Sequence, residues 1–350
     1  MRKMTHANLR NITFVLLVIF LLSGCTNSSA TPLPSDQTTP DSTFPTNEPI
    51  TLPSTTPNVE KVVYIQAEQP ISFDPAMIST QLEDFARSNG YQFETAQTFS
   101  PSDLQANWKV VVMIEPTLDI AGLANSTPNT RFIVITTQEL TPTQNLDVIQ
   151  QSSVNEAFIA GYLTTIIADD IRSGGLLASN ADNAANLENA FLNGGYYYCG
   201  RCASVLGPVA NFPFAISRPT HSDSNAWISA FDEMNQNRIN TLYIPQAALT
   251  DTLLGYLASQ NVVLVSSAKP PEEYQYLFAA IIQSDIQTDL NSILASIKDE
   301  QPGIKVTASY KLTDIQEKWL TEGKQRLVEN VIAAISDGSI YPLPPFPTGE

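Results

Sequence analysis

The stretch Asn155–Asp170, NEAFIAGYLTTIIADD, lies near the middle of the folded part of the chain and indicates the type of fold. Its apolar residues recur at i, i+1, i+4, i+5, i+8 and i+9, which makes one continuous face of a helix with about 3.6 residues per turn. These residues are Phe158, Ile159, Tyr162, Leu163, Ile166 and Ile167. Asn155 is expected to cap this helix and Glu156 to complement its dipole. Periodicity alone is also typical of a plain buried core helix.

Apolar, β-branched runs alternate with helical segments on both sides of this stretch. Strands are predicted at 61–66, 91–97, 108–115, 131–136, 147–151, 175–179, 212–217, 241–245, 262–267, 277–283 and 305–312. Other helices are predicted at 75–89, 185–197, 224–237, 250–259, 285–298 and 321–337. Continuous apolar runs are typical of parallel strands that are covered on both faces. The alternation therefore predicts an α/β protein with two Rossmann-like, doubly wound lobes.

The first 24 residues have the features of a secretory signal. Three basic residues precede an apolar run at 12–22, which is too short to span a membrane comfortably. The run ends in Leu22–Cys25, LSGC, which resembles the lipobox of bacterial lipoproteins. That resemblance implies cleavage before Cys25 and acylation, including palmitate, of this cysteine. An ordinary secretory signal with an incidental cysteine is the alternative.

A linker and a binding domain are expected after the signal peptide. Residues 25–59 are rich in Ser, Thr and Pro and have almost no apolar periodicity, so this segment is expected to stay extended and unfolded. It predicts a stalk between the membrane and a domain at 60–346.

The chain is strongly acidic. Its 18 Lys and Arg residues and 35 Asp and Glu residues give a formal net charge of −17. Removing the signal leaves 15 basic residues, and 15 − 35 = −20. This balance argues against nucleic acid and anionic lipid as direct partners.

Two segments are similar to a known family. Residues 129–161 contain NTRFIVIT and then NEAFIAGYL, and residues 323–342 read GKQRLVENVIAAISDGSIYP. Both resemble the basic membrane lipoprotein family, which has the periplasmic-binding-protein type I fold and includes purine-nucleoside receptors of ABC importers. The resemblance implies lobe 1 at about 60–152 plus 278–304, and lobe 2 at about 153–277 plus the C-terminal segment. It also implies an ABC permease as partner.

The ligand-binding motifs depart from the family pattern. In the loop at 67–75, Ser72 and Phe73 match the family, but Pro70 and Ile71 stand where the family has Asp and Lys. Residues 265–269 read VSSAK and lack the family's carboxylates, and Gln283 lies near the position of a binding lysine. These departures favour a second hypothesis, a sensory or scaffolding envelope lipoprotein with an altered or lost pocket.

Ligand contacts are expected in the cleft between the lobes, beyond the carboxyl ends of the strands. Phe73 could stack on a flat ligand or pack into its own lobe. Four of the other candidates lie at or just past the ends of predicted strands, where plain turn residues are also common: Glu115, Asn180, Gln246 and Lys269. The candidate ligand-binding residues are Phe73, Asp74, Glu115, Asn180, Gln246 and Lys269.

Few residues suggest other chemistry. Cys199 and Cys202 form CGRC and are expected to make a disulfide in an exported protein. A zinc site would need two further ligands, so neither a metal nor a cofactor is expected. His221 lies in THSD, which suggests a hydrolase only if a serine and a carboxylate meet it in space. No catalytic motif is present, which argues against an enzyme.

These observations predict a lipid-anchored, extracytoplasmic solute-binding protein of an ABC importer. It would be a monomer that closes on a small molecule, with a nucleoside as the first expectation. The sensory or scaffolding lipoprotein and the hydrolase that uses His221 remain as alternatives.

Overall fold

The first of two six-stranded sheets is wholly parallel and has the strand order β13-β5-β4-β3-β1-β2. The computed structural model describes residues 59–66, 73 and 75–343. The strands of this sheet are β1 (Lys61–Ile65), β2 (Gln92–Ala96), β3 (Trp108–Ile114), β4 (Arg131–Thr136), β5 (Leu146–Gln150) and β13 (Lys305–Thr307). Helices α1 (Pro75–Ser88) and α7 (Ile286–Lys298) cover one face, and α2 (Ile120–Ser126) covers the other.

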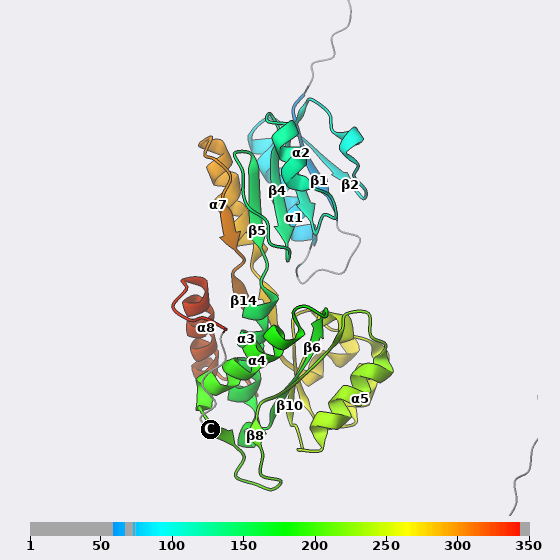
Figure 1. Ribbon diagram of the computed structural model, residues 1–350, viewed down its shortest axis with the longest axis vertical. Helices are drawn as coiled ribbons and strands as arrows, with labels where there is room; N and C mark the ends of the chain where they lie inside the picture. Colours follow the sequence, from blue (N-terminus) through cyan, green and yellow to red (C-terminus); the bar gives the residue numbers. More distant parts are fainter. Residues whose placement is uncertain (1–58, 67–72, 74, 344–350) are drawn as a thin grey trace, which may run out of the picture. The chain divides into compact units, whose positions relative to one another are not determined.

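The second sheet has the order β14-β12-β11-β10-β6-β9, and only the edge strand β14 is antiparallel to its neighbour. Its strands are β6 (Ser173–Ser179), β9 (Phe214–Pro219), β10 (Thr241–Ile244), β11 (Val263–Ser266), β12 (Phe278–Ser284) and β14 (Tyr310–Thr313). Helices α3 (Ser153–Ile167), α4 (Ala184–Cys199) and α8 (Glu322–Ser336) pack on one face. Helices α5 (Ser224–Asn235) and α6 (Asp251–Ala258) pack on the other, as Figure 1 shows for α3, α4 and α5.

The two predicted doubly wound lobes are therefore confirmed. Each lobe has its own core on both faces of its sheet, because its strands are continuous apolar runs. A short hairpin of β7 (Cys202–Ala203) and β8 (Asn211–Phe212) follows α4 and is not part of either large sheet.

Helix α3 is buried all round rather than along one face. Every residue from Ala157 to Ile167 is buried, because α4 and α8 cover the sides of α3 that the sheet does not. The cap also differs from the expectation. Ser152, not Asn155, precedes the first turn, and its hydroxyl accepts a hydrogen bond from the backbone N–H of Asn155.

Helices α3 and α4 pack against each other without side chains at two positions. A Cβ atom added at Gly161 would lie 1.9 Å from the backbone oxygen of Phe191, and one added at Gly194 would lie 2.0 Å from that of Phe158. A glycine in each helix thus allows the backbone of the other helix to approach closely. In α3 this residue is Gly161, and the backbone that it faces is that of Phe191 in α4.

Three chain segments pass between the sheets: from β5 to α3, from β12 to α7, and from β13 to β14. The predicted single strand at 305–312 is wrong, because Lys305–Thr307 pairs with β5 whereas Tyr310–Thr313 pairs with β12. Ser309 lies between these two strands. Its backbone oxygen accepts from the N–H of Asp285, and its own N–H donates to the Asp289 carboxylate over 3.1 Å.

The pairing of β12 also moves a lobe boundary. The expected division gave residues 278–304 to lobe 1, but Phe278–Ser284 pairs with β11 and β14 in the second sheet. The chain therefore crosses to the first lobe only after Ser284, at the start of α7.

The expected signal peptide, Cys25 and most of the linker lie outside the described residues. Among the residues that are described, no helix is both long enough and apolar enough to cross a membrane.

Candidate functional site

The carboxyl ends of the first sheet's strands carry a closed polar network around Glu115. This residue follows β3 and has a φ of 44°. Its carboxylate accepts hydrogen bonds from the backbone N–H of Thr137 (2.6 Å) and from the hydroxyls of Thr136 (3.0 Å) and Thr137 (3.3 Å). Glu115 therefore joins the ends of β3 and β4, and its oxygens are already engaged.

Two glutamines lie where the chain first passes from one sheet to the other, which we call the first crossover. Gln150 is the last residue of β5, and Gln151 follows it. The amide nitrogen of Gln151 donates to the Ser284 hydroxyl over 3.3 Å, which links the first crossover to the end of β12. Gln150 is 9% exposed, and its amide nitrogen reaches the backbone oxygens of Thr136 and Gln151 at 3.4 Å. Its Oε1 is buried and has no hydrogen-bond partner among the described residues. A buried acceptor in this state needs a water molecule or a ligand.

A second polar group lies at the carboxyl ends of β10 and β11. The hydroxyl of Tyr243, in β10, donates to Oε1 of Glu156 over 2.5 Å, and the Ser267 hydroxyl also hydrogen-bonds within this group. Tyr243 is 3% exposed, and Glu156 lies in the first turn of α3. A carboxylic acid and two hydroxyls thus meet at one edge of the second sheet, and we call Glu156, Tyr243 and Ser267 the strand-end cluster.

The strand-end cluster adjoins the crossover segments. The hydroxyl of Tyr310, the first residue of β14, donates to the backbone oxygen of Ser152 over 2.7 Å and also hydrogen-bonds with the Ser284 side chain. Tyr310 is close enough to Glu156 for the carboxylate charge to act on its ionisation. The three segments that pass between the sheets are therefore linked beside the cluster, through hydrogen bonds that join Ser152, Ser284 and Tyr310.

Burial controls the ionisation of this group. Loss of solvent raises the pKa of Glu156, and hydrogen bonds from Tyr243 and Ser267 only partly oppose that rise. The pKa of Tyr243 is raised well above 10.0, first by burial and then by the charge of Glu156. The pKa of Tyr310 is raised by burial and by the same charge. The two tyrosines thus remain hydrogen-bond donors, and Glu156 can act as either donor or acceptor according to pH.

The candidate residues from the sequence are spread over different environments. Phe73 is 7% exposed and packs into the core of the first lobe with α1 and α7, which is the alternative given for it above. Asp74 lies outside the described residues. Asn180 follows β6 in a turn, where its Oδ1 accepts from the N–H groups of Asp182 (3.1 Å) and Asn183 (3.0 Å).

The remaining two candidates follow β10 and β11. Gln246 begins a single turn of 3₁₀ helix after β10 and is partly buried. Lys269 extends into solvent with 64% of its side chain exposed and lies 3.9 Å from Asp314. Sequence reasoning located the strand ends but missed the strand-end cluster and Gln150. The available signal was an acid, Glu156, at the start of an otherwise apolar helix.

The cysteines and the histidine take structural or solvent positions. A disulfide joins Cys199 at the end of α4 to Cys202 at the start of β7, with Cα atoms 5.4 Å apart. His221 is exposed in the turn before α5, and Asp223 caps that helix by accepting from the N–H of Ala226. No cluster of three or more metal-ligating side chains occurs in the part of the chain that the structure describes.

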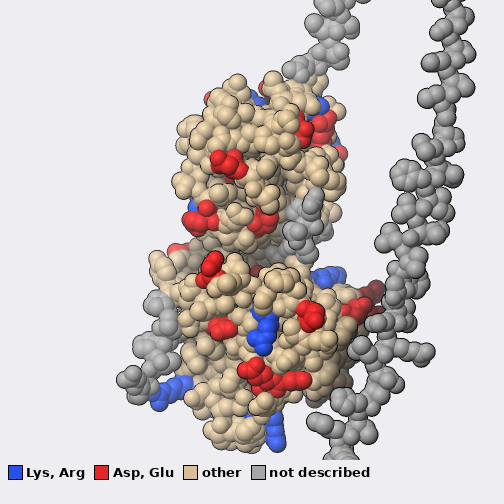
Figure 2. Space-filling view, turned by 45° about the vertical axis from the view of Figure 1, so that its right-hand side comes forward, with Lys and Arg blue, Asp and Glu red and all other residues tan. Residues whose placement is uncertain are grey.

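A groove of about 780 Å³ lies between α1 and α7. Met77, Phe85 and Leu294 form its apolar part, and Gln81, Asn291 and Lys298 are among its polar residues. The described face in Figure 2 carries scattered Asp and Glu side chains, with Lys and Arg at separate points rather than in a patch.

Comparisons with known proteins identify the fold but not the family. No family model matches the chain, and no curated protein does. An ABC transporter solute-binding protein from Conexibacter woesei has a TM-score of 0.58 at 14% identity, covering 82% of this chain and 98% of its own. A second, from Aeropyrum pernix, has a TM-score of 0.54 at 13% identity, covering 81% and 92%.

A third similar structure has a different described role. It is a transcriptional activator of the comK gene from Bacillus halodurans, with a TM-score of 0.56 at 7% identity, covering 81% of this chain and 100% of its own. These likenesses show a shared type I fold. At these identities the fold is all that they show.

Proposed function

We propose that this protein is a lipid-anchored, extracytoplasmic binding protein that takes a small solute between its two lobes and delivers it to an ABC permease. The observation that carries this proposal is the strand-end cluster, together with the buried Gln150 at the end of β5. It places hydroxyl, carboxyl and amide groups at the carboxyl ends of the sheets, which is where open α/β folds bind ligands. The solute-binding proteins with similar folds support the same assignment.

The chemistry of these groups favours a neutral solute with hydroxyl or amide groups. The carbonyl oxygen of Gln150, which has no hydrogen-bond partner among the described residues, can accept from a hydroxyl or amide group of the solute. The hydroxyl of Tyr243 already donates to Glu156, so these two side chains offer the solute their remaining acceptor capacity. Lys269, the one cation among the sequence candidates, has 64% of its side chain exposed. A nucleoside or a sugar would present several hydroxyl groups to the polar groups at the strand ends.

The acylated Cys25 and the permease belong to this proposal through the sequence. The LSGC motif supports anchoring, and the resemblance to basic membrane lipoproteins supports an importer. Catalysis is not part of the proposal, since His221 is exposed and its neighbour Asp223 is engaged as a helix cap.

A thermal-shift screen tests the proposal. Residues 26–350, which contain both sheets and all core clusters, would be melted with nucleosides, nucleobases, sugars and amino acids. A ligand at a hundred times its Kd adds about 2.7 kcal/mol, enough to raise Tm by roughly 4–5 °C in a folded domain of this size. A rise in Tm with any of these four classes of compound supports binding, and the class that causes it indicates the chemical class of the solute.

The Kd values of site variants test whether the ligand binds at the strand ends. Ser267→Ala and Gln150→Leu each remove one hydrogen-bonding group at the strand ends, so each should weaken binding roughly tenfold or more. Asn180→Ala and Lys269→Ala serve as controls and should leave Kd unchanged, because one lies in a turn and the other in solvent. Equal effects in both sets would place the ligand elsewhere.

A regulatory role is the second candidate. The comK activator has the same fold, and several ligand-binding candidates from the sequence are engaged within the protein or buried. Glu115 is held by two threonines, and Phe73 is packed in the core. An absence of any shift across the whole screen would favour this role over transport.

A further inference from the structure

The loop between β7 and β8 exposes a group of aliphatic side chains. Val205 is 85% exposed, Leu206 67% and Val209 74%, and the loop extends from the end of α4 beside β8 (Figure 1). We call these three residues the aliphatic tip. Exposed aliphatic groups that gather at one point need an explanation, unlike those scattered singly over a surface.

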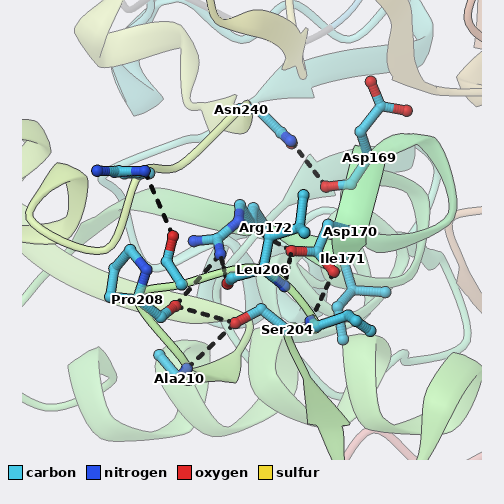
Figure 3. Close-up of polar contacts among 12 residues, drawn as sticks. Asp169, Asp170, Ile171, Arg172, Ser204, Leu206, Pro208, Ala210 and Asn240 are labelled. Carbon is cyan, nitrogen blue, oxygen red and sulfur yellow. Dashed lines mark hydrogen bonds and ion pairs between the residues drawn. The ribbon is translucent and has the colours of Figure 1, made fainter.

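The backbone of this loop is tied to the protein by charged side chains. The Asp170 carboxylate accepts from the N–H groups of Val205 (2.7 Å) and Leu206 (3.1 Å). Arg172 is 6% exposed, and its guanidinium donates to the backbone oxygens of Leu206 and Pro208 and to the Asp170 carboxylate. Figure 3 shows both side chains directed into the loop from the segment that precedes β6.

Further contacts complete this support. The hydroxyl of Ser204 donates to the oxygen of Pro208 and accepts from the N–H of Ala210, as Figure 3 shows. Arg238 donates to the oxygen of Gly207 over 3.3 Å. Arg172 also lies 5.5 Å from the centre of the Phe212 ring. The loop is thus held in one position, with many of its backbone polar groups paired inside the protein.

We propose that the aliphatic tip of the β7–β8 loop inserts into the interfacial region of a lipid bilayer. A segment that enters lipid must satisfy its backbone hydrogen bonds internally, since the apolar phase offers no partners. Asp170, Arg172, Ser204 and Arg238 supply such bonds here, and the side chains left outside are aliphatic.

The size of the tip favours lipid over a protein partner. Specific protein interfaces bury roughly 800 Å² on each side, and three aliphatic side chains supply only a fraction of that. The acidic balance of the chain, −17, argues against attraction by anionic headgroups, so the contact is apolar and should resist salt. The proposed anchor at Cys25 would hold the domain near the bilayer and raise the local concentration of the tip.

Vesicle flotation tests this inference without the anchor, and so its outcome does not depend on the solute-binding proposal. Residues 26–350 would be floated with phosphatidylcholine vesicles at 0.05 and 0.5 M salt, about a tenfold range chosen to expose electrostatic binding. The unmodified protein should float at both concentrations. Leu206→Asp/Val209→Asp should lower the partition coefficient roughly tenfold or more, because it removes apolar area and adds charge.

The control adds the same charge at exposed leucines elsewhere. Leu118→Asp/Leu327→Asp changes side chains that are 37% and 44% exposed and should float like the unmodified protein. Equal loss in both double variants would overturn the proposal, as would an unmodified protein that stays with the aqueous fraction.

A fluorescent label reports insertion directly. Leu206→Cys carrying an environment-sensitive dye should show a blue shift on addition of the same vesicles, whereas Leu327→Cys with the same dye should not. Equal spectra at the two positions would contradict insertion of the tip. Near-ultraviolet circular dichroism of each variant would confirm that the fold is intact.

Discussion

The hydroxyl of Tyr243 lies 2.5 Å from Oε1 of Glu156 and connects the carboxyl end of β10 to the first turn of α3. This contact places an acid, which the sequence shows only as a helix-start residue, among buried groups at the edge of the second sheet. Since Tyr310 and Ser152 hydrogen-bond beside it, the pair lies where the chain passes between the sheets. Its ionisation should therefore affect both stability and binding.

Glu156→Gln should make the protein more stable at high pH. Burial raises the pKa of Glu156 above its usual 4.5, so the folded state binds this proton more tightly than the unfolded state. Stability from this group is then present below pH 4.5 and is lost as pH rises through the raised pKa. Glutamine keeps an acceptor oxygen for Tyr243 without the charge. Melting curves from pH 4 to 9 should show an advantage for the variant that grows with pH, as the sign of the shift requires.

The control for that experiment is Glu329→Gln, which changes an exposed acid on α8. Its Tm should stay close to that of the unmodified protein, because surface substitutions usually change stability by less than about 0.5 kcal/mol. A Glu156→Gln variant that is less stable at every pH would show that the charged carboxylate is required.

Tyr243→Phe should destabilise the protein by about 1–3 kcal/mol, because it leaves a buried acceptor without its donor. The loss should be larger at pH 8 than at pH 5, since the hydroxyl favours the charged form of Glu156. Tyr256→Phe is a matched control, because that hydroxyl donates to Asp232 over 2.5 Å in an exposed position. Its cost should stay under about 0.5 kcal/mol in urea unfolding. Equal costs would mean that burial of the first pair is energetically unimportant.

Asp147→Asn should cost about 3–5 kcal/mol, the usual loss when one partner of a buried ion pair is removed. Asp147 is fully buried and accepts from Nε (2.6 Å) and Nη2 (2.8 Å) of Arg131 and from the N–H of Ile304 (2.9 Å). The control is Glu83→Gln, whose partner Arg87 is 69% exposed, and its cost should be below about 1 kcal/mol. Denaturant midpoints compare the two, and a small cost for Asp147→Asn would contradict this account.

Gly161→Ala and Gly194→Ala should each destabilise the second lobe by about 3 kcal/mol or more, because the new methyl group meets the backbone of the facing helix within 2.0 Å. Gly323→Ala is the control, since nothing lies within 4 Å of its added Cβ and the residue is at the start of α8. That change should be neutral or stabilise by up to about 1 kcal/mol. Thermal unfolding separates the outcomes, and tolerance of alanine at Gly161 would show that α3 and α4 can move apart.

The strands were predictable because each is a continuous apolar run bounded by turn residues. Strand β4 begins and ends at the predicted residues, Arg131 and Thr136, and the helices differ from the prediction by a few residues at their ends. The run at 305–312 was predicted as one strand because local sequence cannot show that its two halves pair with strands of different sheets. The hydrogen bonds of Ser309 with Asp285 and Asp289, which are far earlier in the chain, accompany that change.

From the sequence, the candidate site could be located only at the carboxyl ends of the predicted strands, and not residue by residue. Residues that follow strands could be counted from the sequence, and Glu115 and Gln246 do lie at strand ends. Which of them has free hydrogen-bonding capacity depends on neighbours from other strands. Thr136 and Thr137 engage Glu115, whereas Gln150 keeps an unpaired oxygen.

The sequence by itself determined the two α/β lobes, because strand and helix periodicities are local properties of the chain. It also showed the acidic balance that argues against nucleic acid as a direct partner. Only the tertiary structure decided that Glu156 meets Tyr243, that Phe73 belongs to a core, and that Asp170 and Arg172 hold the β7–β8 loop. These contacts join residues distant in the chain, and their burial and pairing arise only when the elements pack together.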